Sequence, residues 1–243
     1  MENKKTAQAV WQKISKEKNA EKAKALSYFF KTGPGQYGEG DFFLGITVPV
    51  SRKVAKEFAG LPLTEIKILL ANKYHEVRMV ALAILVANYE KAKNDSERKK
   101  IFQFYLTNSK KINNWDLVDL TAPNIIGDYC VRYPENLALL RKMTQAKNLW
   151  QRRIAILATF TFIKKGSNKE VFEFAEILLS DKEDLMHKAV GWMLRESGKR
   201  VSMKDLETFL KKNIKKMPRT ALRYAIEHFE EGKRKAYLKM PIK

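Results

Sequence analysis

The feature that most constrains the fold of this chain is a repeated helical pattern, in which a basic residue precedes an alanine-rich apolar run. The pattern occurs in VRMVALAIL (77–85), RRIAILATF (152–160), HKAVGWMLR (187–195) and PRTALRYAI (218–226). Arg153 lies 35 residues before Lys188, and Lys188 lies 31 residues before Arg219. The 75 residues between Arg78 and Arg153 are about two such periods, and the skipped copy falls near Trp115. Strand-like alternation bounded by turns is almost absent, so the pattern predicts repeated helix pairs.

Periods of this length predict an all-α fold, an α-solenoid of HEAT-like antiparallel helix pairs with a basic concave face. The second helix of each pair lines the inner face of such a stack, which would bring the repeated basic residues together there. We expect one domain over residues 1–243. Residues 6–50 would form N-terminal helices and a glycine-rich loop, residues 51–229 the helix-pair repeats, and residues 230–243 an exposed basic extension.

The charge balance indicates a polyanionic partner. Lys and Arg number 47 and Asp and Glu 27, which gives a formal net charge of +20. A basic groove that follows a phosphate backbone explains such an excess. A basic protein without a polyanionic partner is the alternative, and a membrane surface fits less well because the basic residues are spread along the chain. The residues expected to contact such a backbone are Arg78, Arg152, Arg153, Lys188 and Arg219.

Several classes of site are excluded or disfavoured. A single cysteine, Cys130, allows no internal disulfide and no cysteine-based zinc site, and its apolar neighbours predict an inert core thiol. His75, His187 and His228 do not form a metal-ligand motif, so we expect no metal and no cofactor. The start of the chain has no continuous apolar run, and no stretch is long enough to cross a membrane. We therefore expect a soluble protein of the reducing cytoplasm.

A glycine-rich segment, TGPGQYGEGD, covers residues 32–41. It lacks the G-K-[ST] ending of a phosphate-binding P-loop, and no strand precedes it. We interpret it as a connection that needs positive φ angles, whose backbone could also lie against a ligand.

The segment NNWDLVD (113–119) sets Trp115 and Asp119 four residues apart, so that a helix would place both on one face. Core packing of the indole beside a solvated carboxylate is the alternative interpretation. For Trp192, the alternative interpretation is likewise a structural one, that it is a core residue of its repeat.

Three segments, NNWDLVD, LWQRRIAIL and KAVGWMLRE, resemble the signature segments of the AlkD-type DNA alkylation repair proteins, which are HEAT-like DNA glycosylases. FLGITVP and PENL are also similar to that family, and the resemblance runs from about residue 20 to about residue 230 in matching order. It implies an active cleft formed by Trp115, Asp119, Arg153 and Trp192. Arg152 is adjacent to Arg153, and we favour Arg153 because the apolar run IAIL follows it directly.

The resemblance implies a monofunctional glycosylase that hydrolyses the N-glycosidic bond of cationic alkylated purines, N3-methyladenine and N7-methylguanine, in duplex DNA. Asp119 would stabilise the oxocarbenium-like sugar and position a water, the two indoles would add cation–π attraction, and Arg153 would hold a phosphate. The family is understood not to enclose the base. No lysine is placed as a Schiff-base nucleophile, so no lyase step is expected. Since not all members carry a similar glycine-rich loop, and related branches bind DNA without base excision, a noncatalytic binder of damaged or branched DNA remains the alternative. A helical protein scaffold is a third interpretation, and a monomer is expected.

Overall fold

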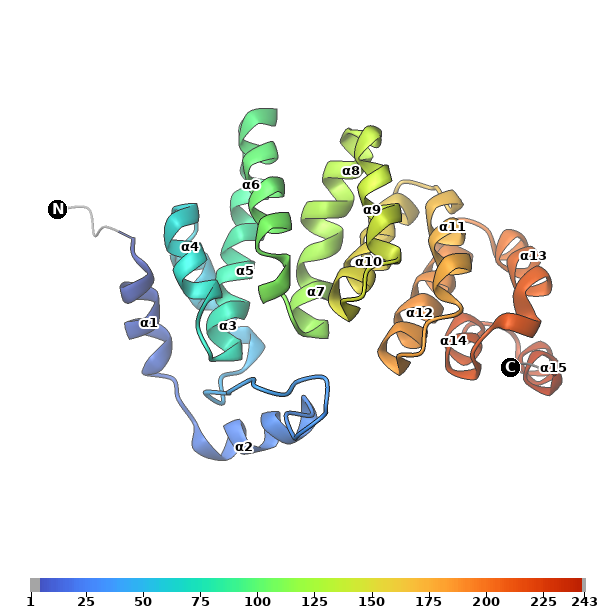
Figure 1. Ribbon diagram of the computed structural model, residues 1–243, viewed down its shortest axis with the longest axis horizontal. Coiled ribbons are helices and arrows are strands. Elements are labelled where there is room, and N and C mark those ends of the chain that lie inside the picture. The colour runs from blue at the N-terminus through green and yellow to red at the C-terminus, as the bar shows by residue number, and fades with distance from the viewer. Residues whose placement is uncertain (1–4, 242–243) are drawn as a thin grey trace. The chain divides into compact units, whose positions relative to one another are not determined.

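The computed structural model describes residues 5–241, and these residues are predominantly helical (Figure 1). They divide into two compact units, a first unit that ends at Thr121 and a second unit that begins at Ala122. Within residues 5–241, β-type pairing is limited to one isolated parallel bridge between Phe42 and Tyr74. The predicted all-α class is confirmed.

The first unit is built around α5 (His75–Glu90), which packs against α3, α4 and α7. Val77, Ala81 and Leu85 on this helix are completely buried, because α5 is apolar on nearly all sides. The other elements of the unit are α1 (Ala7–Ser15), α2 (Ala20–Phe29), α3 (Val48–Glu57), α4 (Leu63–Leu70), α6 (Asp95–Thr107), the 3₁₀ turn η1 (Ser109–Lys111) and α7 (Trp115–Thr121).

Helix α2 differs from the other helices of the unit because none of its residues is buried. Tyr28 and Phe29 near its end are 90% and 60% exposed. The glycine-rich loop follows, with positive φ at Gly35 (71°) and Gly40 (85°), as expected for that segment. The loop ends at Asp41, whose side chain is buried.

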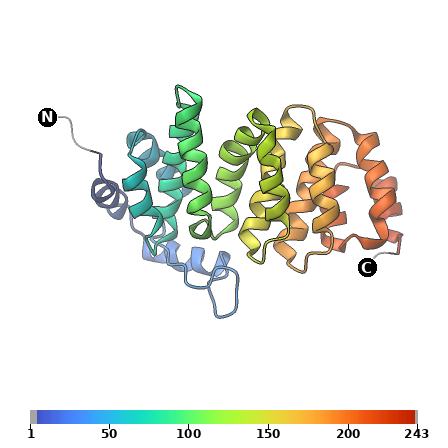
Figure 2. The same ribbon diagram turned by 45° about the horizontal axis from the view of Figure 1, so that its top comes forward.

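The second unit contains the remaining helix pairs (Figure 2). Its elements are the π-helical η2 (Ala122–Gly127), α8 (Asp128–Arg132), the 3₁₀ turn η3 (Pro134–Asn136), α9 (Leu137–Thr144), α10 (Leu149–Lys164), α11 (Lys169–Leu178), α12 (Asp184–Arg200), α13 (Met203–Asn213), the 3₁₀ turn η4 (Ile214–Lys216), α14 (Arg219–Ala225) and α15 (Glu231–Lys239). Helix α10 packs against α9, α11 and α12, and α12 packs against α13 and α14.

The four alanine-rich runs lie on α5, α10, α12 and α14, and the first three are the second helices of the packed pairs α4/α5, α9/α10 and α11/α12, whereas α13 and α14 both pack on α12. The predicted helix pairing is therefore confirmed for three of the four runs. Gly191 shows why one run needs a glycine: a Cβ there would lie 2.4 Å from the Ala221 carbonyl oxygen on α14. The close approach of α12 and α14 depends on that missing methyl group.

The C-terminal segment, expected to be an exposed basic extension, contains a helix. Residues Glu231–Lys239 form α15. Tyr237 is 4% exposed, and its ring packs edge-on against Phe229 at 5.5 Å. The segment is helical because one aromatic side chain anchors it, while its lysines remain exposed.

Candidate functional site

Helix α7 places Trp115 and Asp119 one turn apart, and both are half-buried. The helix begins after Asn114, whose side-chain Oδ1 accepts a hydrogen bond from the Trp115 amide at 2.8 Å. Both predicted residues line one cleft of about 460 Å³ in the first unit. The cleft is also lined by Leu26, Phe29, Phe30, Val48, Ser51, Arg52, Met79, Ala83, Asp116 and Leu120. The one-face arrangement predicted from the spacing is thus present in the structure.

Aromatic rings fix the orientation of Trp115. Its indole stacks on Phe30, with ring centroids 5.3 Å apart and planes at 12°. Phe29 meets the indole edge-on at 6.1 Å, and Phe30 stacks in turn on Phe43 at 5.0 Å. Such offset and edge-on pairs each contribute about 0.5–1.5 kcal/mol beyond area burial. The indole is therefore held by α2 and by the segment after the glycine-rich loop.

A buried ionic network lies beside this cleft. The His75 ring is 2% exposed, with Nδ1 3.2 Å from Asp41 Oδ2 and Nε2 2.8 Å from Asp116 Oδ2. Asp41 also accepts hydrogen bonds from Arg78 Nη2 at 2.6 Å and from Asn114 Nδ2 at 3.0 Å. The network connects the end of the glycine-rich loop, the start of α5 and the first turn of α7.

Both ring nitrogens of His75 face carboxylates, which is the geometry of a doubly protonated imidazolium. Burial alone would lower the pKa of His75, but its hydrogen bonds to Asp116 and Asp41 outweigh burial, and the pKa is raised. Burial likewise raises the pKa of Asp41, but the hydrogen bond from His75 and the positive charge of Arg78 outweigh it, and the pKa is lowered. Asp41 is thus held as a carboxylate.

A second buried carboxylate, Glu76, holds the FLGITVP segment. It accepts hydrogen bonds from the backbone amides of Leu44, Gly45 and Ile46 at 2.9–3.2 Å. Gly45 has φ of +83°, and a Cβ there would lie 1.9 Å from the Asn19 carbonyl oxygen. Glycine is therefore required by both backbone conformation and space.

The other predicted catalytic residues lie in the second unit. Arg153, the fifth residue of α10, is 5% exposed and donates from Nη1 to the Leu185 carbonyl oxygen at 2.8 Å. Trp192 on α12 is half-buried and lies 6.3 Å from the ring of Phe160. Each therefore packs against a neighbouring element of its own unit.

Two of the predicted DNA-contacting arginines are occupied inside their units. Arg78 is 5% exposed, is bonded to Asp41, and donates to the carbonyl oxygens of Asn72 and Lys73. Arg152 forms an ion pair with Asp181 at 2.6 Å and donates to the carbonyl oxygens five and six residues before it. These guanidiniums fasten the turn between the two helices of a pair, so a role at a DNA-facing surface does not fit them.

The repeat register differs by one residue from the predicted alignment. The structurally equivalent positions are the fourth residues of α5, α10 and α12, which are Arg78, Arg152 and His187. The His187 Nε2 atom bonds the carbonyl oxygen of Asp181, which lies six residues earlier. Arg78 and Arg152 likewise each donate to the carbonyl oxygen six residues earlier. The predicted alignment of Arg78 with Arg153 and Lys188 is therefore wrong.

Lys188 and Arg219 line one cavity of about 780 Å³ in the second unit. Lys188 pairs with Asp184 at 2.7 Å, and Arg219 is exposed and donates from Nη1 to the Leu238 carbonyl oxygen. Arg223 and Arg234 line the same cavity. These four basic side chains are the candidate phosphate contacts of the second unit.

The roles of Asp41, His75, Glu76, Asn114 and Asp116 were not predicted from the sequence. The sequence signals for them are that Asp116 directly follows Trp115 in NNWDLVD and that His75 and Glu76 begin a helix. Within residues 5–241, no group of three or more His, Cys, Asp or Glu side chains is arranged to hold a metal ion. Every helix in that range is too short or too polar to span a bilayer.

Comparisons with known proteins agree with this architecture. A search of curated proteins found no match. A structure from Enterococcus faecalis, described as a predicted DNA alkylation repair enzyme, is similar with a TM-score of 0.69 and 21% identity, over 88% of this chain and 98% of that chain. AlkD2 from Streptococcus mutans is similar with a TM-score of 0.54 and 18% identity, over 92% of this chain and 97% of that chain. The sequence model of the family described as DNA alkylation repair enzyme matches residues 10–229. The chain therefore belongs to the DNA alkylation repair enzyme family.

Proposed function

We propose that this protein is a monofunctional DNA glycosylase that hydrolyses the N-glycosidic bond of cationic N3- and N7-alkylated purines in double-stranded DNA. The observation that carries the proposal is the placement of the Asp119 carboxylate one helical turn from the Trp115 indole, in a cleft of about 460 Å³. Family membership and the net charge of +20 support a DNA substrate.

The chemistry needs one carboxylate and no general acid. An N3- or N7-alkylated purine carries a positive charge, and it leaves as a neutral base when the glycosidic bond breaks. Positive charge then develops on the deoxyribose, as in glycoside hydrolysis. Asp119 would stabilise that charge and position the attacking water. No metal or cofactor takes part in the proposed reaction.

The aromatic and basic residues have proposed roles around this step. The Trp115 face would attract the cationic sugar, worth about 1–2 kcal/mol where water is excluded. Trp192 is assigned the same role and Arg153 a phosphate contact, both by the resemblance to the family. Lys188 and Arg219 would contact phosphates away from the reaction.

The test is base release from methylated duplex DNA, measured by chromatography. Asp119→Asn should lower the rate by about 10²–10³ and leave DNA affinity intact. Asp95→Asn is the matched control, because the Asp95 side chain is 72% exposed and does not line the cleft. Tight DNA binding without base release by the wild type would support the noncatalytic binder instead. Equal release by wild type and Asp119→Asn would refute the assigned role.

A further inference from the structure

The cavity of about 780 Å³ in the second unit has a wall that carries more positive than negative charge. Most of its residues lie on α12, α14 and α15. Its charged residues are Asp184, Lys188, Arg219, Arg223, Glu227 and Arg234. Four cations and two carboxylates give the wall a net charge of +2. The cavity therefore suits an anion better than a neutral or cationic ligand.

Both carboxylates of this wall already have partners. Asp184 pairs with Lys188 at 2.7 Å and accepts a hydrogen bond from the Thr220 hydroxyl at 3.2 Å. Glu227 pairs with Arg195, which does not itself line the cavity. Because each carboxylate is balanced by a neighbouring cation, the repulsion that an incoming anion meets is reduced.

The three arginines of the wall differ in how far they are occupied. Arg219 donates from Nη1 to the Leu238 carbonyl oxygen at 2.7 Å, which joins α14 to α15. Arg223 and Arg234 are exposed, and within residues 5–241 neither guanidinium has a hydrogen bond or an ion pair. Each of these two guanidiniums therefore offers five N–H donors to a ligand.

The cations of the wall come from three helices. Arg219 and Arg223 lie four residues apart on α14, so they share one face of that helix. Lys188 lies on α12 and Arg234 on α15. Since a guanidinium binds phosphate oxygens through two parallel hydrogen bonds, cations from several helices suit a group with several anionic oxygens.

Tyr224 adds an aromatic surface to the same wall. It is 36% exposed and directly follows Arg223. In the described part of the chain, no second aromatic ring and no cation packs on its ring. A nucleobase attached to the phosphate can stack there, because every base has an aromatic face.

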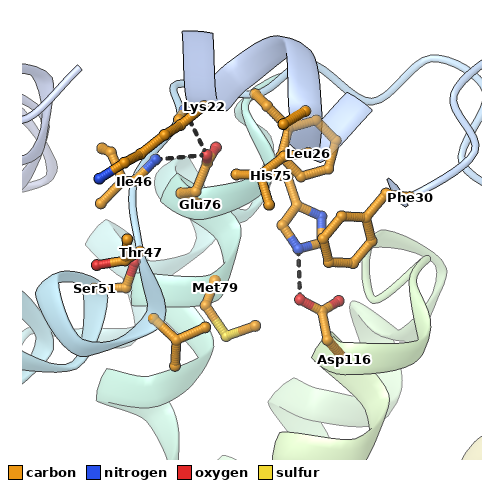
Figure 3. A pocket seen from close by; sticks show the side chains of 14 residues that line it. Lys22, Leu26, Phe30, Ile46, Thr47, Ser51, His75, Glu76, Met79 and Asp116 are labelled. Carbon is orange, nitrogen blue, oxygen red and sulfur yellow. Dashed lines mark hydrogen bonds and ion pairs between the residues drawn. The ribbon is translucent and has the colours of Figure 1, made fainter. Parts of the chain in front are cut away.

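The pocket of the first unit has a different chemistry (Figure 3). Its volume is about 370 Å³, and Leu26, Phe30 and Met79 make its wall largely apolar. The carboxylates of Glu76 and Asp116 on that wall accept hydrogen bonds and cannot donate them. Such a wall replaces little of the hydration of a phosphate, so the cavity of the second unit is the better phosphate site of the two.

We propose that the cavity of the second unit binds a phosphate monoester attached to a nucleobase, the chemical class of a phosphorylated strand end or a free nucleoside monophosphate. A monoester carries a charge of about −1.5 to −2 at pH 7, which balances the wall, whereas a phosphate within a strand carries a single charge. The proposal goes beyond DNA contacts of the proposed function, because the cavity selects the end of a strand over its backbone. It does not depend on base release.

The first test compares two trinucleotides by calorimetry with the full-length protein. One has a 5′-phosphate, and the other has the methyl ester of that phosphate. Both have the same number of phosphates, but the methyl ester has a lower charge at the end. We expect the free 5′-phosphate to bind at least about fivefold more tightly. Equal affinity, or binding of neither trinucleotide, would overturn the proposal.

Paired variants test the location. Arg223→Gln with Arg234→Gln should abolish the preference for the free phosphate and leave the melting temperature unchanged, since neither guanidinium has an internal partner. Lys204→Gln with Lys211→Gln is the matched control, because it removes the same charge from exposed positions on α13 that do not line the cavity. A preference that persists without the two arginines, or that is lost equally in both double variants, would refute the site.

A third measurement separates the two sources of the ligand. Thymidine 5′-monophosphate that binds as tightly as the phosphorylated trinucleotide would support a free nucleotide, and tighter binding of the trinucleotide would support a strand end. Tyr224→Leu should weaken both by about fivefold or more, and unchanged binding would refute the stacked base. All these ligands are undamaged, so failure of this proposal leaves the glycosylase intact, and absence of base release leaves this site intact.

Discussion

The imidazole of His75 bonds Asp116 at 2.8 Å, and Asp116 directly follows Trp115 in the first turn of α7. The same ring faces Asp41 at the end of the glycine-rich loop. One buried side chain therefore connects the loop to the helix that carries Trp115 and Asp119. Removing it should alter both the stability of the first unit and the orientation of α7.

The first prediction is that His75→Gln lowers the free energy of unfolding by about 3–5 kcal/mol, because it removes the buried imidazolium between Asp116 and Asp41 and leaves Arg78 to balance Asp41 alone. Urea unfolding at neutral pH measures this. His228→Gln, at an exposed position, is the control. A decrease below about 1 kcal/mol in His75→Gln would show that the network contributes little to stability.

The second prediction concerns pH. Because the pKa of His75 is raised in the folded protein, its contribution is complete below the ordinary histidine pKa and is lost as pH rises through the raised value. The pKa of Asp41 is lowered, so its contribution is complete above the ordinary aspartate pKa and is lost as pH falls through the lowered value. Denaturant unfolding at a series of pH values should therefore show that the wild type loses stability both as the pH is lowered into the acidic range and as it is raised into the alkaline range. His75→Gln should remove the loss in the alkaline range. An unchanged alkaline slope in the variant would contradict this assignment.

The third prediction separates two glycines. Gly45 and Gly35 both have positive φ, but a Cβ at Gly45 would lie 1.9 Å from the Asn19 carbonyl oxygen, whereas nothing lies within 4 Å of one at Gly35. Gly35→Ala should cost about 1–2 kcal/mol, the strain of a left-handed non-glycine residue. Gly45→Ala should cost clearly more, because α2 must also move away from the 43–48 segment. Thermal unfolding of both variants measures the difference, and equal costs would show that Asn19 moves freely.

The fourth prediction distinguishes basic residues by role. Lys188→Gln and Arg219→Gln should weaken DNA binding and reduce the slope of log affinity against log salt by about 0.9 for each phosphate that the variant no longer neutralises. Lys211→Gln, an exposed change of equal charge on α13, is the control and should change the slope less. If all three variants change it equally, the cavity lined by Lys188 and Arg219 is not a specific DNA-binding site.

In the same salt titration, a change at Arg152 should give a different result. Arg152→Gln should lower the melting temperature, because it removes the ion pair with Asp181 and two hydrogen bonds to the turn before α10. Its effect on the salt slope should be small. A reduced slope with unchanged melting temperature would restore Arg152 as a phosphate contact.

The fifth prediction concerns Cys130. Its thiol is fully buried, and burial raises its pKa to about 12. The native protein should therefore not react with a thiol reagent at neutral pH, whereas the urea-unfolded chain should react completely. Rapid labelling of the native protein would contradict the buried position.

Sequence periodicity predicted the helices and their pairing well, because the apolar pattern of each helix is visible within its own segment of the sequence. An alanine-rich run such as IAILATF is apolar on nearly all sides, so it must be buried by the helix before it. The pairing α9/α10 follows from that requirement. The spacing of Trp115 and Asp119 was equally local, and one helical turn joined them in the cleft.

The register of the basic residues was not predictable in the same way. Arg152 and Arg153 are adjacent, and a period near 35 residues fits either one. Only the helix start at Leu149 places Arg152 at the position equivalent to Arg78, where the side chain reaches the preceding turn. Internal ion pairs and hydrogen bonds then occupy Arg78 and Arg152, two of the expected DNA contacts.

The sequence by itself determined the helical class, the repeated pairs and the pair of residues on α7, because each follows from a regular spacing of residues along the chain. Only the tertiary structure brings Asp41, His75 and Asp116 together. His75 is 34 residues from Asp41 and 41 residues from Asp116 along the chain. No periodicity links residues at those separations. Their contact exists because the glycine-rich loop turns Asp41 inward beneath α7, where a buried carboxylate is stable only beside a positive charge.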